Sequence, residues 1–274
     1  MGVGGSNPLV PTNSNRDLRG YTESDGPVQA SILIVIAAFL TSILSGIFGM
    51  AGGLVLMGLL AWLLPVTTAL ALHGTIQFAS NIWRALLHRR HVVWPVLLWF
   101  GAGAAAAVGF FSLVLFAPTK FYVFLGLGLM PILVWLPERW LPLDAANRWH
   151  ALGGGFVSTG IALISGVSGP VTDMLFINTR LGRHQIVATK AVMQAMGHAS
   201  KILVYGGVLL GASAQAAIPL SATAIAIVAS MAGIMVGGVI LDRISDAHFR
   251  ATRRWLVTLI GATFLFQAIQ IAIG

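Results

Sequence analysis

The chain has 274 residues, of which 57% are hydrophobic and only 9% are charged, and its mean hydropathy is +0.88. About 25% of the residues in a soluble domain are charged, so this composition excludes a soluble globular protein and indicates an integral membrane protein. The net charge of +8 does not indicate nucleic-acid binding, because the basic residues cluster in short loops beside apolar segments, as the positive-inside rule describes.

Apolar runs of roughly 20 residues predict an all-α membrane protein, since the strands of a membrane barrel would alternate instead. Residues 1–27 are rich in Gly, Asn, Ser and Pro and are predicted to form a disordered polar tail without the basic region of a signal peptide. The apolar segments expected as membrane helices or half-helices are 28–49, 51–64, 67–87, 92–116, 119–136, 151–169, 170–177, 186–210, 218–241 and 254–273.

One short phrase occurs in each half of the chain, Ser45-Gly46-Ile47-Phe48-Gly49 and Ser165-Gly166-Val167-Ser168-Gly169. We expect both copies to break a helix inside the membrane, where broken backbone is tolerated only when it is buried in protein or lines a cavity. A helix that restarts after the break directs free N–H groups and a partial positive charge at the space before it. Two such tips would form an anion site, with hydroxyl donors from Ser45, Ser165 and Ser168. The simpler interpretation is that the glycines only allow close helix packing.

A polar stripe with the same spacing follows each phrase. Its residues are His73, Gln77, Asn81 and Arg84 in the first half, and Lys190, Gln194, His198 and Lys201 in the second. The spacing i, i+4, i+8, i+11 places each set on one helical face, and polar groups at membrane depth usually face a cavity or a partner. The stripes are rich in donors and lack a carboxylate, which favours an anionic ligand over a cation. The alternative interpretation is a hydrogen-bonded interface that braces the hairpins.

The basic loops predict how the two halves are oriented. All of them lie in the cytoplasm if the segment around each phrase turns back as a re-entrant hairpin. The prediction is two inverted repeats, each a re-entrant or broken helical hairpin plus three transmembrane helices, at 28–137 and 151–274 with a cytoplasmic linker at 138–150. A competing topology of eight simple spans with parallel halves would place a basic loop outside.

The predicted substrate site combines the two phrases with the inner parts of the stripes. Its residues are Ser45, Gly46, Gly49, Gln77, Asn81, Arg84, Ser165, Gly166, Ser168, Gly169, Gln194, His198 and Lys201. Asp173 is the one acidic residue expected at membrane depth, where it pairs with Lys190 or Lys201 or takes up a proton for coupling. His198 is a second candidate for proton coupling, because imidazole titrates near neutrality.

Three motifs resemble those of the TauE/SafE sulfite exporter family. They are Ala188-Thr189-Lys190-Ala191 followed by Gly197-His198-x-x-Lys201 and Tyr205, then Gly166-Val167-Ser168-Gly169-Pro170, and Arg90-His91-Val92-Val93-Trp94. The resemblance covers about residues 30–274 and implies a carrier in the bacterial inner membrane that exports sulfite, organosulfonates or related small anions. The chain departs from the family at Gly49-Met50-Ala51-Gly52-Gly53, where a near-continuous glycine run is common, and at His198, where asparagine is common.

We therefore expect a secondary transporter that exports a small anion, sulfite or an organosulfonate such as sulfoacetate, by alternating access around a midplane site. An anion channel, or a carrier of another carboxylate or sulfur-containing anion, is the alternative, and an intramembrane enzyme has only the phrase serines with His198 as candidate chemistry. We expect no cofactor, no metal site and no nucleic-acid partner. The expected partners are the anion and the lipid bilayer, and a homo-oligomer stays open. With no cysteine, disulfides and thiolate metal sites are excluded.

Overall fold

The computed structural model describes residues 14–114, 118–137, 140–211, 218–241, 243 and 246–273, and the elements in these ranges are all helical. In chain order they are α1 (Ser14–Phe48), α2 (Met50–Leu63), α3 (Val66–Leu87), η1 (Arg89–His91), α4 (Trp94–Val114), α5 (Lys120–Trp135), α6 (Arg148–Ser165), α7 (Gly169–Met174), α8 (Arg183–Tyr205), η3 (Gly206–Leu210), α10 (Leu220–Leu241) and α11 (Asp246–Ile273). The all-α fold predicted from the apolar runs is confirmed.

Within the described residues, four helical segments are long and apolar enough to cross a membrane, namely Val28–Phe48, Trp94–Val114, Leu220–Leu241 and Arg254–Ile273. The striped helices α3 and α8 are of similar length, at 22 and 23 residues. They carry the polar stripes, which lower their hydropathy, so the apolar helices around them have to separate the stripes from lipid.

The helix breaks lie at the two glycine phrases, as predicted. Helix α1 ends at Phe48 and α2 begins at Met50, while α6 ends at Ser165 and α7 begins at Gly169. The beginning of α1 differs from the prediction, because the helix starts at Ser14 and residues 14–27 of the expected disordered tail are helical. Once an apolar helix exists, each further residue adds one backbone hydrogen bond, so a polar extension needs no new nucleus. Residues 1–13 lie outside the described residues.

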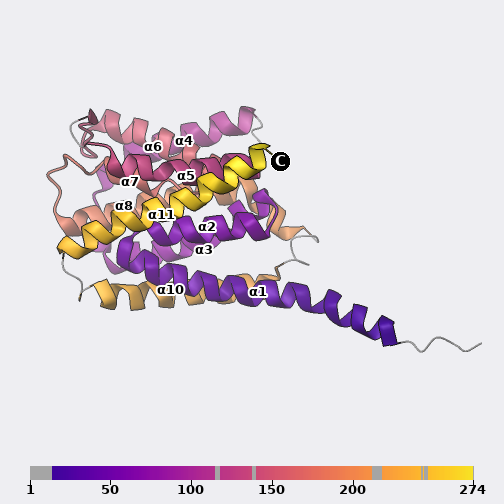
Figure 1. The fold of residues 1–274 in the computed structure, drawn as a ribbon. Coiled ribbons are helices and arrows are strands. Elements are labelled where there is room, and N and C mark those ends of the chain that lie inside the picture. Colours follow the sequence, from indigo (N-terminus) through magenta and orange to yellow (C-terminus); the bar gives the residue numbers. More distant parts are fainter. Residues whose placement is uncertain are drawn as a thin grey trace, which may run out of the picture.

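The helices associate in pairs that bring the two halves together. The most extensive contacts join α1 with α10, α4 with α6, α3 with α8, and α5 with α11. Figure 1 shows the pair α1 and α10 on one side of the molecule and the pair α4 and α6 on the other, with the remaining helices between them. If α1 to α5 are matched in order with α6, α7, α8, α10 and α11, exchanging the halves turns the first pair into the second and leaves the last two pairs unchanged.

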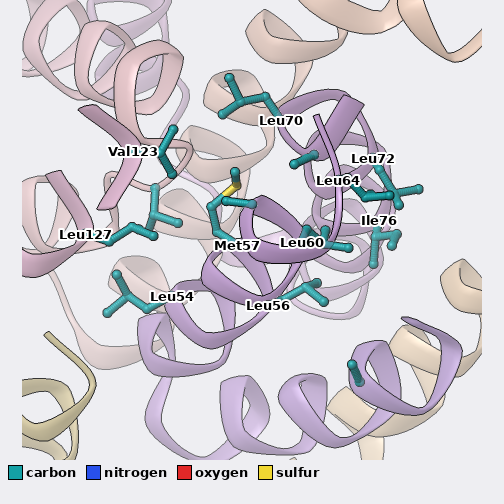
Figure 2. Packing of buried hydrophobic residues seen from close by; sticks show 14 of the residues in the cluster. Leu54, Leu56, Met57, Leu60, Leu64, Leu70, Leu72, Ile76, Val123 and Leu127 are labelled. Carbon is teal, nitrogen blue, oxygen red and sulfur yellow. The ribbon is translucent and has the colours of Figure 1, made fainter. Parts of the chain in front are cut away.

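The main apolar core forms around α2, which is hydrophobic on every side and is therefore surrounded by other helices. Leu54, Met57 and Leu60 are almost fully buried there, against Leu70 of α3 and Leu127 of α5. Figure 2 shows these side chains converging from the three helices. We call α1 with α2 the first hairpin and α6 with α7 the second. Because α2 directly follows the first break, this core holds the second arm of the first hairpin in the middle of the bundle.

Helices α1 and α10 approach closely at a pair of glycines. A Cβ added at Gly46 would lie 2.8 Å from the Cα of Gly237, so neither position has room for a side chain. Gly46 therefore packs α1 against α10, which is the simpler interpretation that the sequence left open for this glycine.

Candidate functional site

The two helix breaks rest on glycines with left-handed backbone. Gly49 has a φ of 73° and Gly166 a φ of 83°, and they are the positive-φ glycines among the described residues. Space around Gly49 is open, whereas a Cβ at Gly166 would collide with Met57 of α2 and contact Leu70 of α3. The left-handed conformation disfavours any L side chain at both positions, and at Gly166 the packing also excludes one.

The last residue of each stripe binds the carbonyl end of the broken helix in its own half. Nη2 of Arg84 donates to the carbonyl of Ser45 over 3.3 Å, and Nζ of Lys201 donates to the carbonyl of Gly166 over 2.6 Å. The carboxyl end of a helix carries unpaired carbonyls and a partial negative charge, which cationic side chains stabilise. Arg84 and Lys201 therefore complete the ends of α1 and α6.

The first residue of each stripe binds the second arm of its hairpin. Nε2 of His73 donates to the carbonyl of Gly53 in α2 over 3.0 Å. Lys190 forms an ion pair with Asp173. Asp173 lies four residues after Gly169, just as Gly53 lies four residues after Gly49, so the two bonds are made at equivalent positions of the two hairpins. Asp173 thus has the pairing expected of a structural carboxylate, and the stripes brace the hairpins at equivalent positions in both halves.

A direct bond joins the two striped helices. Nζ of Lys201 lies 2.6 Å from Nδ1 of His73. The carbonyl of Gly53 only accepts, so Nε2 of His73 carries the ring proton and Nδ1 is the acceptor for Lys201. Gly74 lets the helices approach, because a Cβ there would lie 3.2 Å from the Cβ of Lys201. Lys201 is 0% exposed and contacts no carboxylate in the described part of the chain.

A small cavity with a volume of about 30 Å³ lies where the two hairpins meet the two stripes. Its lining comes from both halves: Ser45, Gly49, Met50, Gly53, His73, Gln77, Asn81, Ala162, Val167, Ser168, Gly169, Gln194, Gly197 and His198. The lining contains no acidic side chain, and the ring of His198 stands edge-on to that of His73 with centroids 5.4 Å apart. The cavity is therefore polar, and none of the described residues that line it is a carboxylate.

Several lining groups are hydrogen-bond donors. The hydroxyl of Ser168 accepts from Ser158 over 2.9 Å, which leaves its own proton for the cavity. Nε2 of Gln194 lies 3.5 Å from where a Cβ of Gly169 would stand, so this amide reaches the second hairpin. Met50 begins α2, a helix of 14 residues whose amino end carries free N–H groups. This arrangement suits the oxygen atoms of an anion.

The family model described as "Sulfite exporter TauE/SafE" matches residues 34–264 of this chain. The chain belongs to the TauE/SafE sulfite exporter family. Membership makes it a multi-pass membrane protein of a transporter family, whose activity is the export of sulfite or a related anion. No curated protein and no solved structure matches the chain.

The structure brings most of the substrate-site residues predicted from the phrases and stripes to the cavity. Those that line it are Ser45, Gly49, Gln77, Asn81, Ser168, Gly169, Gln194 and His198. The lining does not include Gly46, Arg84, Ser165, Gly166 and Lys201. Apart from Gly46, which packs against α10, these residues shape the breaks or hold the ends of the broken helices behind the cavity wall.

Two of the predicted serine donors have other roles. The hydroxyl of Ser45 donates to the carbonyl of Gly49 over 2.6 Å, and that of Ser165 donates to the carbonyls of Ile161 and Val167. Both hydroxyl protons therefore stabilise the breaks themselves and do not point at a ligand. A serine beside unpaired backbone carbonyls readily makes such local bonds, and sequence alone does not distinguish this use from ligand binding.

Other lining residues were not predicted as site residues. They are Met50, Gly53, His73, Ala162, Val167 and Gly197. Helical periodicity could have indicated two of them, since Gly53 lies one turn after Gly49 and Ala162 one turn before Gly166. Gly197 directly precedes the predicted site residue His198. His73 belongs to the stripe, but only the packing of α3 against α8 reveals that it faces Lys201.

Proposed function

We propose that this chain exports a small oxyanion, sulfite in preference to a larger organosulfonate, by binding it in the cavity between the two hairpins. The observation that carries the proposal is a polar cavity without carboxylates, lined by equivalent residues of both halves. Secondary transporters bind their substrates at the interface of their repeats, where broken helices supply backbone groups.

The charges around the cavity support an anionic substrate. Lys201 lies immediately behind the wall, fully buried, and its bonding partners are a carbonyl and an imidazole with no negative charge. The carboxylate of Asp173 is engaged by Lys190. An anion in the cavity would compensate the buried ammonium of Lys201 and would face the amino end of α2.

The size of the cavity supports a small substrate. A volume of about 30 Å³ is of the order that one or two water molecules need, so the site is nearly closed around its polar groups. A pyramidal anion of four heavy atoms requires less opening than sulfoacetate, which adds a methylene and a carboxylate.

Alternating access between inverted halves is the mechanism we propose. The helix pairs map onto one another when the halves are exchanged, and each stripe braces its own hairpin, which is the two-fold relation that alternating access uses. The bond between Lys201 and His73 joins the two halves beside the cavity. In a bacterial inner membrane, the potential would favour outward movement of an anion by about 2.3 kcal/mol per charge per 100 mV.

Flux of radiolabelled sulfite from proteoliposomes tests the proposal, with sulfoacetate, sulfate and chloride as competitors. We expect saturable sulfite flux that Gln77→Ala and Gln194→Ala each reduce at least tenfold, because each removes an amide from the cavity. Gln270→Ala on the exposed face of α11 is the matched control and should leave flux unchanged. Flux that does not saturate would indicate a channel, and full activity in both cavity variants would move the site elsewhere.

A further inference from the structure

Asn81 presents an unpaired acceptor in a cavity otherwise rich in donors. Its side chain is 6% exposed and lines the cavity. Nδ2 of Asn81 donates to the backbone carbonyl of Gln77 over 2.8 Å, and this bond fixes the orientation of the amide, since a flipped group would set two oxygens against each other. Oδ1 is left buried without a hydrogen-bond partner in the structure.

A buried acceptor is unfavourable unless a donor reaches it. A fully deprotonated oxyanion offers only acceptors, so one of its oxygens would face Oδ1 of Asn81 with no hydrogen between them. The imidazole of His198 stands in the same cavity with an unpartnered Nδ1, and this atom donates or accepts according to its tautomer. Asn81 is therefore the group that distinguishes an anion with a proton from one without.

We propose that the substrate is bound as a singly protonated oxyanion, hydrogen sulfite, whose O–H group donates to Oδ1 of Asn81. This inference rests on the proposed function and specifies the form of the substrate at the same site. The remaining oxygens then accept from Ser168, Gln77 and Gln194, so every ligand oxygen has a suitable partner. The proton stays on the ligand throughout and is not transferred to the protein. Each turnover therefore moves a monoanion, with a net charge of −1, together with the proton that it carries.

Binding should accordingly follow the hydrogen sulfite concentration and weaken as the pH rises and sulfite replaces hydrogen sulfite. The protein also has ionisable groups on both striped helices near Asn81, namely His73 and Arg84 on α3 and His198 and Lys201 on α8. Their titration would change the affinity for any anion. Nitrate separates the two effects, because it is a small oxyanion of single charge that carries no proton near neutrality.

The test measures binding of radiolabelled sulfite to the purified full chain in nanodiscs, from below to above neutral pH, with nitrate as competitor. The variant is Asn81→Leu, which keeps the branched shape and the number of side-chain heavy atoms but removes the acceptor, and Asn178→Leu at an exposed loop position is the matched control. Asn81→Ser, which retains an oxygen acceptor, is a second variant that keeps the test valid if leucine disturbs the fold.

At low pH, Asn81→Leu should weaken sulfite binding about tenfold, the effect of losing one buried hydrogen bond, while nitrate competition changes less than about threefold. In Asn81→Ser, part of the sulfite affinity should return, and the wild type should lose sulfite affinity with rising pH more steeply than nitrate affinity. Parallel weakening of both anions, or no weakening, would overturn this inference alone. A wild type that binds nitrate or chloride but no sulfite would overturn the proposed function and the inference with it.

Discussion

Replacement of Lys201 by methionine tests how the site is held together. The side chain is 0% exposed, and Nζ donates to Gly166 and to His73 over 2.6 Å in each case. Lys201→Met fills similar space but leaves both acceptors buried and unpaired, at about 1–3 kcal/mol each. The variant also removes the desolvation penalty of a buried ammonium that has no carboxylate partner, which offsets part of this cost. We therefore expect the free energy of unfolding to fall by about 2–4 kcal/mol.

The measurement is reversible unfolding of the purified full chain in mixed detergent micelles, with Arg84→Met as the matched variant. Arg84 makes one longer bond, 3.3 Å, to the carbonyl of Ser45, and this carbonyl already accepts from the backbone N–H of Gly49. No acceptor is left unpaired, so the expected loss is about 1 kcal/mol. Equal losses in the two variants, or a neutral Lys201→Met, would refute the reasoning, since the acceptors at Gly166 and His73 would then have other donors.

Three further predictions concern the surrounding structure. Gly237→Ala places a Cβ 2.8 Å from the Cα of Gly46 and should destabilise the chain by about 1–3 kcal/mol in the same unfolding assay, whereas Gly238→Ala meets nothing within 4 Å and should be neutral. Burial, and next the neighbouring basic side chains, lower the pKa of His88 below its ordinary 6.5, so the folded chain binds fewer protons there than the unfolded chain. The wild type should therefore lose more stability than His88→Gln as the pH falls below 6.5, and equal losses would contradict this. Asp173→Asn should keep any dependence of flux on the proton gradient, because the carboxylate is paired with Lys190; loss of that dependence would instead assign Asp173 to coupling.

The fold was predictable to the extent that its signals are local. Apolar runs and the two glycine phrases predicted the helices and their breaks, because hydrophobicity and left-handed backbone depend on a few neighbouring residues. The beginning of α1 at Ser14 was not predicted, since a polar extension carries no hydrophobic period. Residues 14–27 are helical only as a continuation of the apolar part of the same helix.

The sequence predicted which residues lie at the cavity better than it predicted what each side chain binds. Helical spacing alone places Gln77, Asn81, Gln194 and His198 on the faces that line the cavity. The same spacing predicts that Lys201 also lines the cavity, yet its ammonium binds the carbonyl of Gly166 and the ring of His73. Which face of a helix a residue occupies is local information, whereas the atom that its side chain reaches depends on the neighbouring helix.

The sequence by itself determined an all-helical membrane protein with a broken hairpin and a polar helical face in each half. Only the tertiary structure decided that the two faces meet, that His73 and Lys201 join them, and that Oδ1 of Asn81 stays unpaired. The physical reason is the distance along the chain over which each interaction acts. Backbone conformation and periodicity are set within one or two turns of the chain, but a hydrogen bond between α3 and α8 exists only because close packing, permitted at Gly74, brings distant residues within 3 Å.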